Sequence, residues 1–102
     1  MEIKNGTDRF YIGETEKDPD AEIVFKYRRS NLIVIERTFV SEALRGQKIA
    51  AKLLEKVVST AREKRFKIIP KCSYAEKVMN RGDEYKDVLY KEDGDNSPKH
   101  LC

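Results

Sequence analysis

The sequence predicts a single α/β domain built on a mixed β-sheet, and three features support this prediction. Residues 21–28 alternate apolar and polar side chains, as a half-buried strand does. Residues 32–40 begin with apolar side chains on both faces, which is typical of a central strand. Residues 47–64 repeat apolar side chains with the period of an amphipathic helix. A sheet covered by a helix is therefore expected.

The first part of the chain is predicted to form the antiparallel part of this sheet. Short strands are expected at residues 1–4 and 9–12 around Asn5-Gly6, a dipeptide typical of tight hairpins. The polar residues 13–20 and 29–31 are predicted turns.

The second part is predicted to complete a βαβ unit. Residues 66–70 follow the helix as a strand, which we expect to lie parallel to residues 32–40 because a helical crossover joins the two. A short helix that contains residues 74–79 and ends near Gly82 should follow, and then a docked turn at residues 85–89. We expect residues 1–90 to form the domain and residues 91–102 to be a flexible tail.

Composition and charge limit the classes of protein that need to be considered. The 102 residues carry a net charge of +3, and 38% of them are charged. No segment approaches the ~18 apolar residues of a membrane span, and the polar start is unlike a secretory signal, so a cytoplasmic protein is expected. Two cysteines, Cys72 and Cys102, are predicted to be free thiols, and their spacing predicts no metal site.

The junction between the central strand and the long helix, residues 40–50, is a candidate phosphate cradle. A turn that opens a helix leaves backbone N–H groups without helical acceptors, at the positive end of the helix dipole. Arg45 adds a full charge there, and Gly46 allows close approach of the backbone to a ligand. The alternative is an ordinary turn at a helix start with a solvated arginine.

Residues 45–50, Arg-Gly-Gln-Lys-Ile-Ala, resemble the Arg/Gln-x-x-Gly-x-Gly/Ala signature of the GNAT superfamily of N-acetyltransferases. Residues 67–75, Lys-Ile-Ile-Pro-Lys-Cys-Ser-Tyr-Ala, are similar to the small single-domain subgroup of that superfamily. The resemblance covers residues 1–90 and implies a minimal GNAT-like acyl-CoA N-acyltransferase fold. Lys48 departs from the signature, because it stands where the second glycine is usual.

The resemblance implies acetyl-CoA, or CoA, as the cofactor. In the superfamily the signature loop holds the pyrophosphate, and the pantetheine arm pairs with the backbone where two parallel strands splay apart. The residues expected to bind the cofactor are Phe39, Val40, Arg45, Gly46, Gln47, Lys48, Ile49, Ala50 and Ser73.

Cys72, Glu36 and Tyr74 are the candidate catalytic residues. Cys72 is either a thiol activated near the start of a short helix or an inert buried cysteine. Relatives often carry a histidine where Arg37 stands, and arginine cannot act as a general base, so Glu36 with a water is the substitute. Arg37 either orients an anionic group or pairs at the surface with Glu36 or Glu42. Tyr74 is either a proton donor or an aromatic packing residue.

The expected function is transfer of an acetyl group from acetyl-CoA to an amine, either directly or through Cys72. The chain lacks the helical pair that usually follows the first strand of the superfamily, so we expect an open site and a large acceptor such as a protein amine. The alternative function is a non-catalytic CoA-binding module. Neither a nucleic acid nor a membrane is an expected partner, and a monomer or weak dimer is expected.

Overall fold

The computed structural model of the protein describes residues 2–29 and 31–90. The elements run in the order β1 (Lys4–Asn5), β2 (Arg9–Ile12), β3 (Ala21–Arg28), β4 (Leu32–Val40), a 3-10 helix η1 (Glu42–Leu44), α1 (Ile49–Lys64), β5 (Lys67–Pro70) and α2 (Ser73–Met79). The predicted tail, residues 91–102 with His100 and Cys102, lies outside the described residues.

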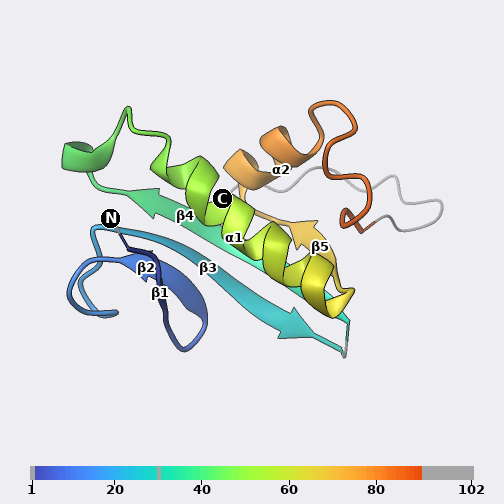
Figure 1. The fold of residues 1–102 in the computed structure, drawn as a ribbon, viewed down its shortest axis with the longest axis horizontal. Coiled ribbons are helices and arrows are strands. Elements are labelled where there is room, and N and C mark those ends of the chain that lie inside the picture. The colour runs from blue at the N-terminus through green and yellow to red at the C-terminus, as the bar shows by residue number, and fades with distance from the viewer. Residues whose placement is uncertain (1, 30, 91–102) are drawn as a thin grey trace.

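The strands form one mixed sheet, as the sequence predicted, and their order in it is β1-β2-β3-β4-β5. Neighbours from β1 to β4 are antiparallel, whereas β5 lies parallel to β4. The helix α1 joins these two parallel strands and lies across one face of the sheet, which we call the front face (Figure 1). The βαβ unit expected from the sequence is therefore confirmed.

The hydrophobic core lies between α1 and the front face. From α1 it takes one buried stripe, which consists of Ile49, Leu53, Leu54, Val57, Val58 and Ala61. The strands contribute alternate residues such as Ile23, Phe25, Ile33 and Ile35, and residues of α2 join the same cluster. The amphipathic pattern of the sequence thus predicted which face of α1 is buried.

The first hairpin turns two residues later than the sequence predicted. Gly6 N–H donates to the Arg9 carbonyl at 2.7 Å, so Thr7 and Asp8 form the tip and β1 is shorter than expected. Gly6 serves close packing instead of the turn, because a Cβ there would come within 2.6 Å of the Glu16 carboxylate. That carboxylate accepts a hydrogen bond from the Thr7 N–H at 2.6 Å.

Residues 85–90 extend the sheet edge beyond β5. Ile68 N–H donates to the Val88 carbonyl at 2.6 Å, and Tyr90 N–H donates to the Ile68 carbonyl at 2.9 Å. The Tyr85 hydroxyl donates to Glu55 of α1 at 2.6 Å, which ties this segment to the helix. The docked turn predicted at residues 85–89 is confirmed.

Candidate active site

The parallel strands β4 and β5 separate partway along β4. Their last facing pair is Ile35 with Pro70, and the Ile35 carbonyl accepts hydrogen bonds from the N–H groups of both Lys71 and Cys72, at 3.0 and 3.1 Å. Beyond that pair β4 continues to Val40 with β3 as its strand partner, whereas β5 has ended. The pairing of the two parallel strands therefore ends at their carboxyl ends, where ligands bind in sheets of this kind, and we call this break in the pairing the gap.

A β-bulge in β4 accompanies this separation. Ile35 faces Phe25 and Arg37 faces Val24, so the pairing with β3 skips Glu36. A bulge bends and twists the strand that contains it. Glu36, the predicted general base, thus lies at the bend where β4 leaves β5, and its side chain is half-buried.

Cys72 and Thr38 meet across the gap. Cys72 is 1% exposed, and its thiol donates to the Thr38 hydroxyl with an Sγ–Oγ1 distance of 3.5 Å. Thr38 comes from β4, whereas Cys72 lies at the junction of β5 and α2. Cys72 is therefore buried beside Thr38, at the end of the β4–β5 pairing.

The other predicted residues of this region lie at the start of α2 and the end of β4. Tyr74 is half-buried, and burial raises the pKa of its hydroxyl, although Arg81 partly opposes this change. A protonated phenol at neutral pH is a hydrogen-bond donor. Ser73 is exposed at the first position of α2. Phe39, at 42% exposed, is one of the large apolar side chains that face solvent.

The loop before α1 contains two residues with left-handed backbone. Gly46 has φ 86°, and a Cβ at this position would meet no atom within 4 Å. Lys48 has φ 59° and ψ 32°, and no side chain caps the helix there. Lys48 therefore adopts a conformation that favours glycine, at the position where the family signature has its second glycine.

The start of α1 leaves backbone donors facing this loop. The first helical hydrogen bond runs from the Lys52 N–H to the Lys48 carbonyl at 3.2 Å, so the N–H groups of Ile49 and Ala50 precede the helical ladder. The helix begins at Ile49, not at Gln47 as predicted, because Lys48 has left-handed backbone. Gln47 itself is exposed.

The Arg45 side chain folds back toward β4. Its Nε donates to the carbonyl of Val40, the half-buried last residue of β4, at 3.2 Å. Arg45 is otherwise exposed, so its guanidinium keeps further N–H groups that face solvent. The loop joins the end of β4 to the start of α1, and it therefore lies at the same end of the sheet as the gap.

Arg37 does not have either of the surface partners that we expected. Its Nη2 donates to Glu22 of the neighbouring strand at 2.7 Å, in place of Glu36 or Glu42. Glu22 is 3% exposed and also accepts from Arg9 Nη1 at 2.6 Å. The sequence pattern placed Glu22 on the polar side of β3 but missed its burial. The signal that was available is the pair of arginines on the two strands that flank it.

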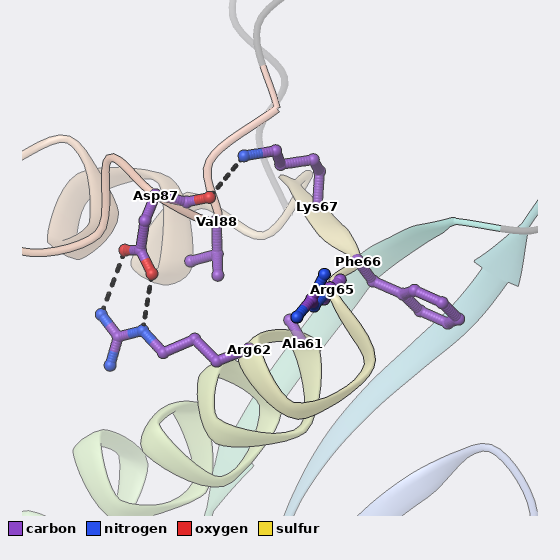
Figure 2. Close-up of a pocket in the computed structure, with 7 residues that line it drawn as sticks. All are labelled: Ala61, Arg62, Arg65, Phe66, Lys67, Asp87 and Val88. Carbon is purple, nitrogen blue, oxygen red and sulfur yellow. Dashed lines mark hydrogen bonds and ion pairs between the residues drawn. The ribbon is translucent and has the colours of Figure 1, made fainter.

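A separate hollow lies at the opposite end of α1 (Figure 2). It has a volume of about 440 Å³ and is lined by Ala61, Arg62, Arg65, Phe66, Lys67, Asp87 and Val88. Arg62 donates to both oxygens of Asp87 at 2.8 and 3.2 Å, which lowers the pKa of this carboxyl, and the Lys67 ammonium donates to the Asp87 carbonyl. These contacts hold residues 84–88 on α1, so we do not place the chemistry there.

Comparison with known proteins identifies the family of this chain. The family model described as GCN5-related N-acetyl-transferase matches residues 9–88. This chain belongs to the GCN5-related N-acetyltransferase family. The family predicted from the sequence is therefore confirmed, and its enzyme class is that of an N-acetyltransferase.

A solved relative shares the fold. The relative is a Staphylococcus aureus protein assigned as a GCN5-like N-acetyltransferase, whose structure was solved by NMR in solution. Its sequence is 41% identical to this chain, and the two structures match with a TM-score of 0.76. The similarity covers 93% of each chain. The predicted GNAT-like fold is confirmed, whereas a search of curated proteins finds no match.

The described residues contain neither a cluster of metal ligands nor a helix that could span a membrane. Within residues 2–29 and 31–90, no three or more His, Cys, Asp or Glu side chains cluster as metal ligands. In the same ranges, no helix has the length and apolar character needed to span a bilayer.

Proposed function

We propose that this N-acetyltransferase binds acetyl-CoA at the loop before α1 and transfers the acetyl group to an amine in the gap between β4 and β5. The observation that carries this proposal is the separation of two parallel strands beside that loop, at one end of the sheet. Acetyl-CoA would supply an activated thioester, and the chain would supply position, hydrogen bonds and a dry crevice.

The loop offers the donors that a pyrophosphate needs. Backbone N–H groups at the start of α1 lie at the positive end of the helix dipole, and space is open beside Gly46. Arg45 would exchange its single bond to the Val40 carbonyl for charge-assisted bonds to phosphate. The ammonium of Lys48 would add a point charge.

In direct transfer, the nitrogen of a neutral amine forms a bond to the acetyl carbonyl carbon. The carbon–sulfur bond then breaks, and the CoA thiolate leaves and takes up the proton lost by the attacking nitrogen. Backbone N–H groups near Phe39 and Val40 would donate to the carbonyl oxygen as charge develops on it. Before the attack, Glu36 with a water would accept the proton of the incoming ammonium. Tyr74 would then carry the second proton, because its hydroxyl would donate to the departing thiolate and regain a proton from the attacking nitrogen.

A relay through Cys72 divides the same reaction into two steps. The Cys72 sulfur would form a bond to the carbonyl carbon while its thiol proton passes to the CoA sulfur that leaves. The amine would then attack the cysteine thioester, and the proton that the nitrogen loses would return to the Cys72 sulfur. The contact with Thr38 supports this variant, because it places the sulfur at the gap. Its burial requires that ligand binding open the crevice.

Calorimetric titration with CoA and with acetyl-CoA tests the binding step. Arg45→Ala should weaken both ligands by ~1.5–3 kcal/mol through lost charge-assisted bonds. Arg65→Ala removes the same charge from the other end of α1, and affinity should be unchanged. Equal effects of the two variants, or no effect of Arg45→Ala, would mean that the pyrophosphate is held elsewhere.

Intact mass measurement after incubation with acetyl-CoA separates the two routes. An acetyl adduct that is absent from Cys72→Ala supports the relay. Absence of an adduct, together with full turnover by Cys72→Ala, supports direct transfer. Thr38→Val should reduce the adduct without abolishing it, because it removes the acceptor of the thiol hydrogen bond.

A non-catalytic CoA-binding module is the second candidate, and the environment of Arg37 favours it. This side chain stands where relatives often have a histidine, and it is held by Glu22. A module of this kind would bind CoA but would not release CoA from acetyl-CoA faster in the presence of amines. A panel of amines that includes protein amino termini and lysines decides between the candidates.

A further inference from the structure

The face of the sheet opposite α1, which we call the back face, carries cations from several strands. Glu22 of β3 bonds to Arg9 of β2 and Arg37 of β4, so these three side chains share one face. Their neighbours Ile23 and Phe25 on β3 lie in the core beneath α1. Because side chains alternate along a strand, Glu22 and its arginines must lie on the opposite face.

The same alternation places two more cations on the back face. Lys26 and Arg28 lie four and six residues after Glu22 on β3, so they share its face, and both are exposed. Tyr27 between them packs toward α1, where the Lys64 ammonium lies 5.4 Å from its ring centre. This contact confirms independently that even-numbered residues of β3 face away from the helix.

No helix in the described residues packs on the back face. The buried residues of α1 and α2 belong to a single cluster with the front-face residues. Leu32 and Val34 of β4 face Arg28 and Lys26 of β3, and they are buried outside that cluster. The long stems of such cations can cover apolar neighbours while their charges remain in water.

Charge is unevenly distributed along this face. Near the gap, Glu22 offsets Arg37, and Arg9 is further paired with Asp8. The exposed Phe39 faces Glu22 directly, so this end is apolar and close to neutral.

The positive excess lies at the other end. Lys26 and Arg28 have no carboxylate opposite them in the ladder, where Val34 and Leu32 stand. Lys4 and Lys67 also lie on this face, but each donates its ammonium to a backbone carbonyl. The distance from Glu22 to Arg28, six residues along a strand, is about 20 Å.

We propose that the back face is the docking surface of the acceptor, and that the acceptor is a protein segment with acidic residues several positions from the acetylated amine. This proposal rests on the proposed function. Because Glu22 faces Phe39, Lys26 and Arg28 lie four and six residues along the strand from that level, about 13 and 20 Å away. These distances exceed the reach of a small amine but equal those of about four to six residues of extended chain. The carboxylates would meet Lys26 and Arg28, while the amine would enter the gap beside Phe39.

The charge pattern favours an acidic peptide over a nucleic acid. A phosphate backbone carries charge at every nucleotide and binds best where cations follow its whole length. Here the carboxylate Glu22 faces Phe39 at the gap end, and the exposed cations Lys26 and Arg28 lie toward the other end. A peptide can confine its negative charge to one end, and this matches the surface.

Peptide binding to the full chain in the presence of CoA tests the proposal. The probes are a labelled twelve-residue peptide with one lysine followed, after four uncharged residues, by three glutamates, its glutamine counterpart, and a twelve-nucleotide oligothymidine. The acidic peptide should bind about tenfold more tightly than its counterpart, since exposed charge pairs each contribute little. Amide shifts on binding should lie in β3 and β4.

Lys26→Gln/Arg28→Gln should remove this preference, whereas Lys17→Gln/Lys77→Gln, with the same charge change elsewhere, should keep it. Equal affinity for both peptides, equal loss in both variants, or tighter binding of the oligothymidine would each overturn the inference. Acetyl-CoA titration of the same samples separates the two proposals. Loss of coenzyme binding would refute the proposed function, whereas coenzyme binding without charge preference would refute only this inference.

Discussion

Lys48 has left-handed backbone at the start of α1, so Lys48→Gly should stabilise the protein. With φ 59° and ψ 32°, this residue has a conformation that costs an L-amino acid about 1–2 kcal/mol. Glycine avoids that cost but loses about 0.5–1 kcal/mol through its greater freedom in the unfolded chain. The net gain is therefore at most about 1.5 kcal/mol and centres on about 0.75 kcal/mol, so for a chain of this size Tm should rise by about 3–6 °C.

Lys48→Ala is the matched control. It removes the same ammonium and keeps the strain, so its Tm should stay below that of Lys48→Gly. Thermal unfolding followed by circular dichroism measures both variants. If Lys48→Gly is no more stable than Lys48→Ala, the left-handed backbone does not store strain and the reasoning is refuted.

The same pair of variants tests the role of the ammonium in coenzyme binding. A direct contact between the Lys48 ammonium and phosphate would weaken binding equally in Lys48→Gly and Lys48→Ala. If the backbone N–H groups hold the ligand without this contact, Lys48→Gly should bind CoA at least as tightly as the parent, since glycine fits the turn. Calorimetry with CoA distinguishes these results.

Two further predictions concern the segment that closes over α1. The hydrogen bond to Glu55 and burial raise the pKa of Tyr85 in the folded protein. The bond therefore stabilises the fold fully below the usual tyrosine pKa of about 10, and this stabilisation is lost as pH rises toward the pKa of Tyr85 in the folded protein. Tyr85→Phe should therefore lower the free energy of unfolding, measured in urea at neutral pH, by about 1–2 kcal/mol. The loss should become smaller in alkali, and a loss independent of pH would contradict this reasoning. Arg62 lowers the pKa of Asp87, so that pair stabilises above the usual aspartate pKa and is lost as pH falls through the folded value. Asp87→Asn should lower Tm slightly at neutral pH and not in strong acid, and a constant difference would argue against the pairing.

Local patterns determined most of the fold. The bounds of β3 and β4 agree with the predicted residues 21–28 and 32–40, because alternation and apolar runs define strands locally. The end of α1 at Lys64 also agrees, since its apolar stripe ends at Ala61. The first turn was misplaced because Gly6 contacts Glu16, which lies ten residues further along the chain.

The site depends on relations that no short pattern contains. The loop at residues 45–50 was recognisable from its own sequence, but the left-handed Lys48 was not, because lysine rarely adopts this backbone. The contact of Cys72 with Thr38 depends on where β4 and β5 separate, which is a property of strand register. The burial of Glu22 requires two arginines from different strands, so it appears only when the sheet is assembled.

The surplus residue in β4 has a consequence for how a break in strand pairing can arise without added structure. Because Ile35 and Arg37 face consecutive residues of β3, excising Glu36 would return the ladder to regular pairing without turning any flanking side chain over. The straightened β4 could then pair with the chain that follows β5 over more residues. One inserted amino acid would thus be enough to convert a continuous sheet into one with an opening, with no added loop or domain.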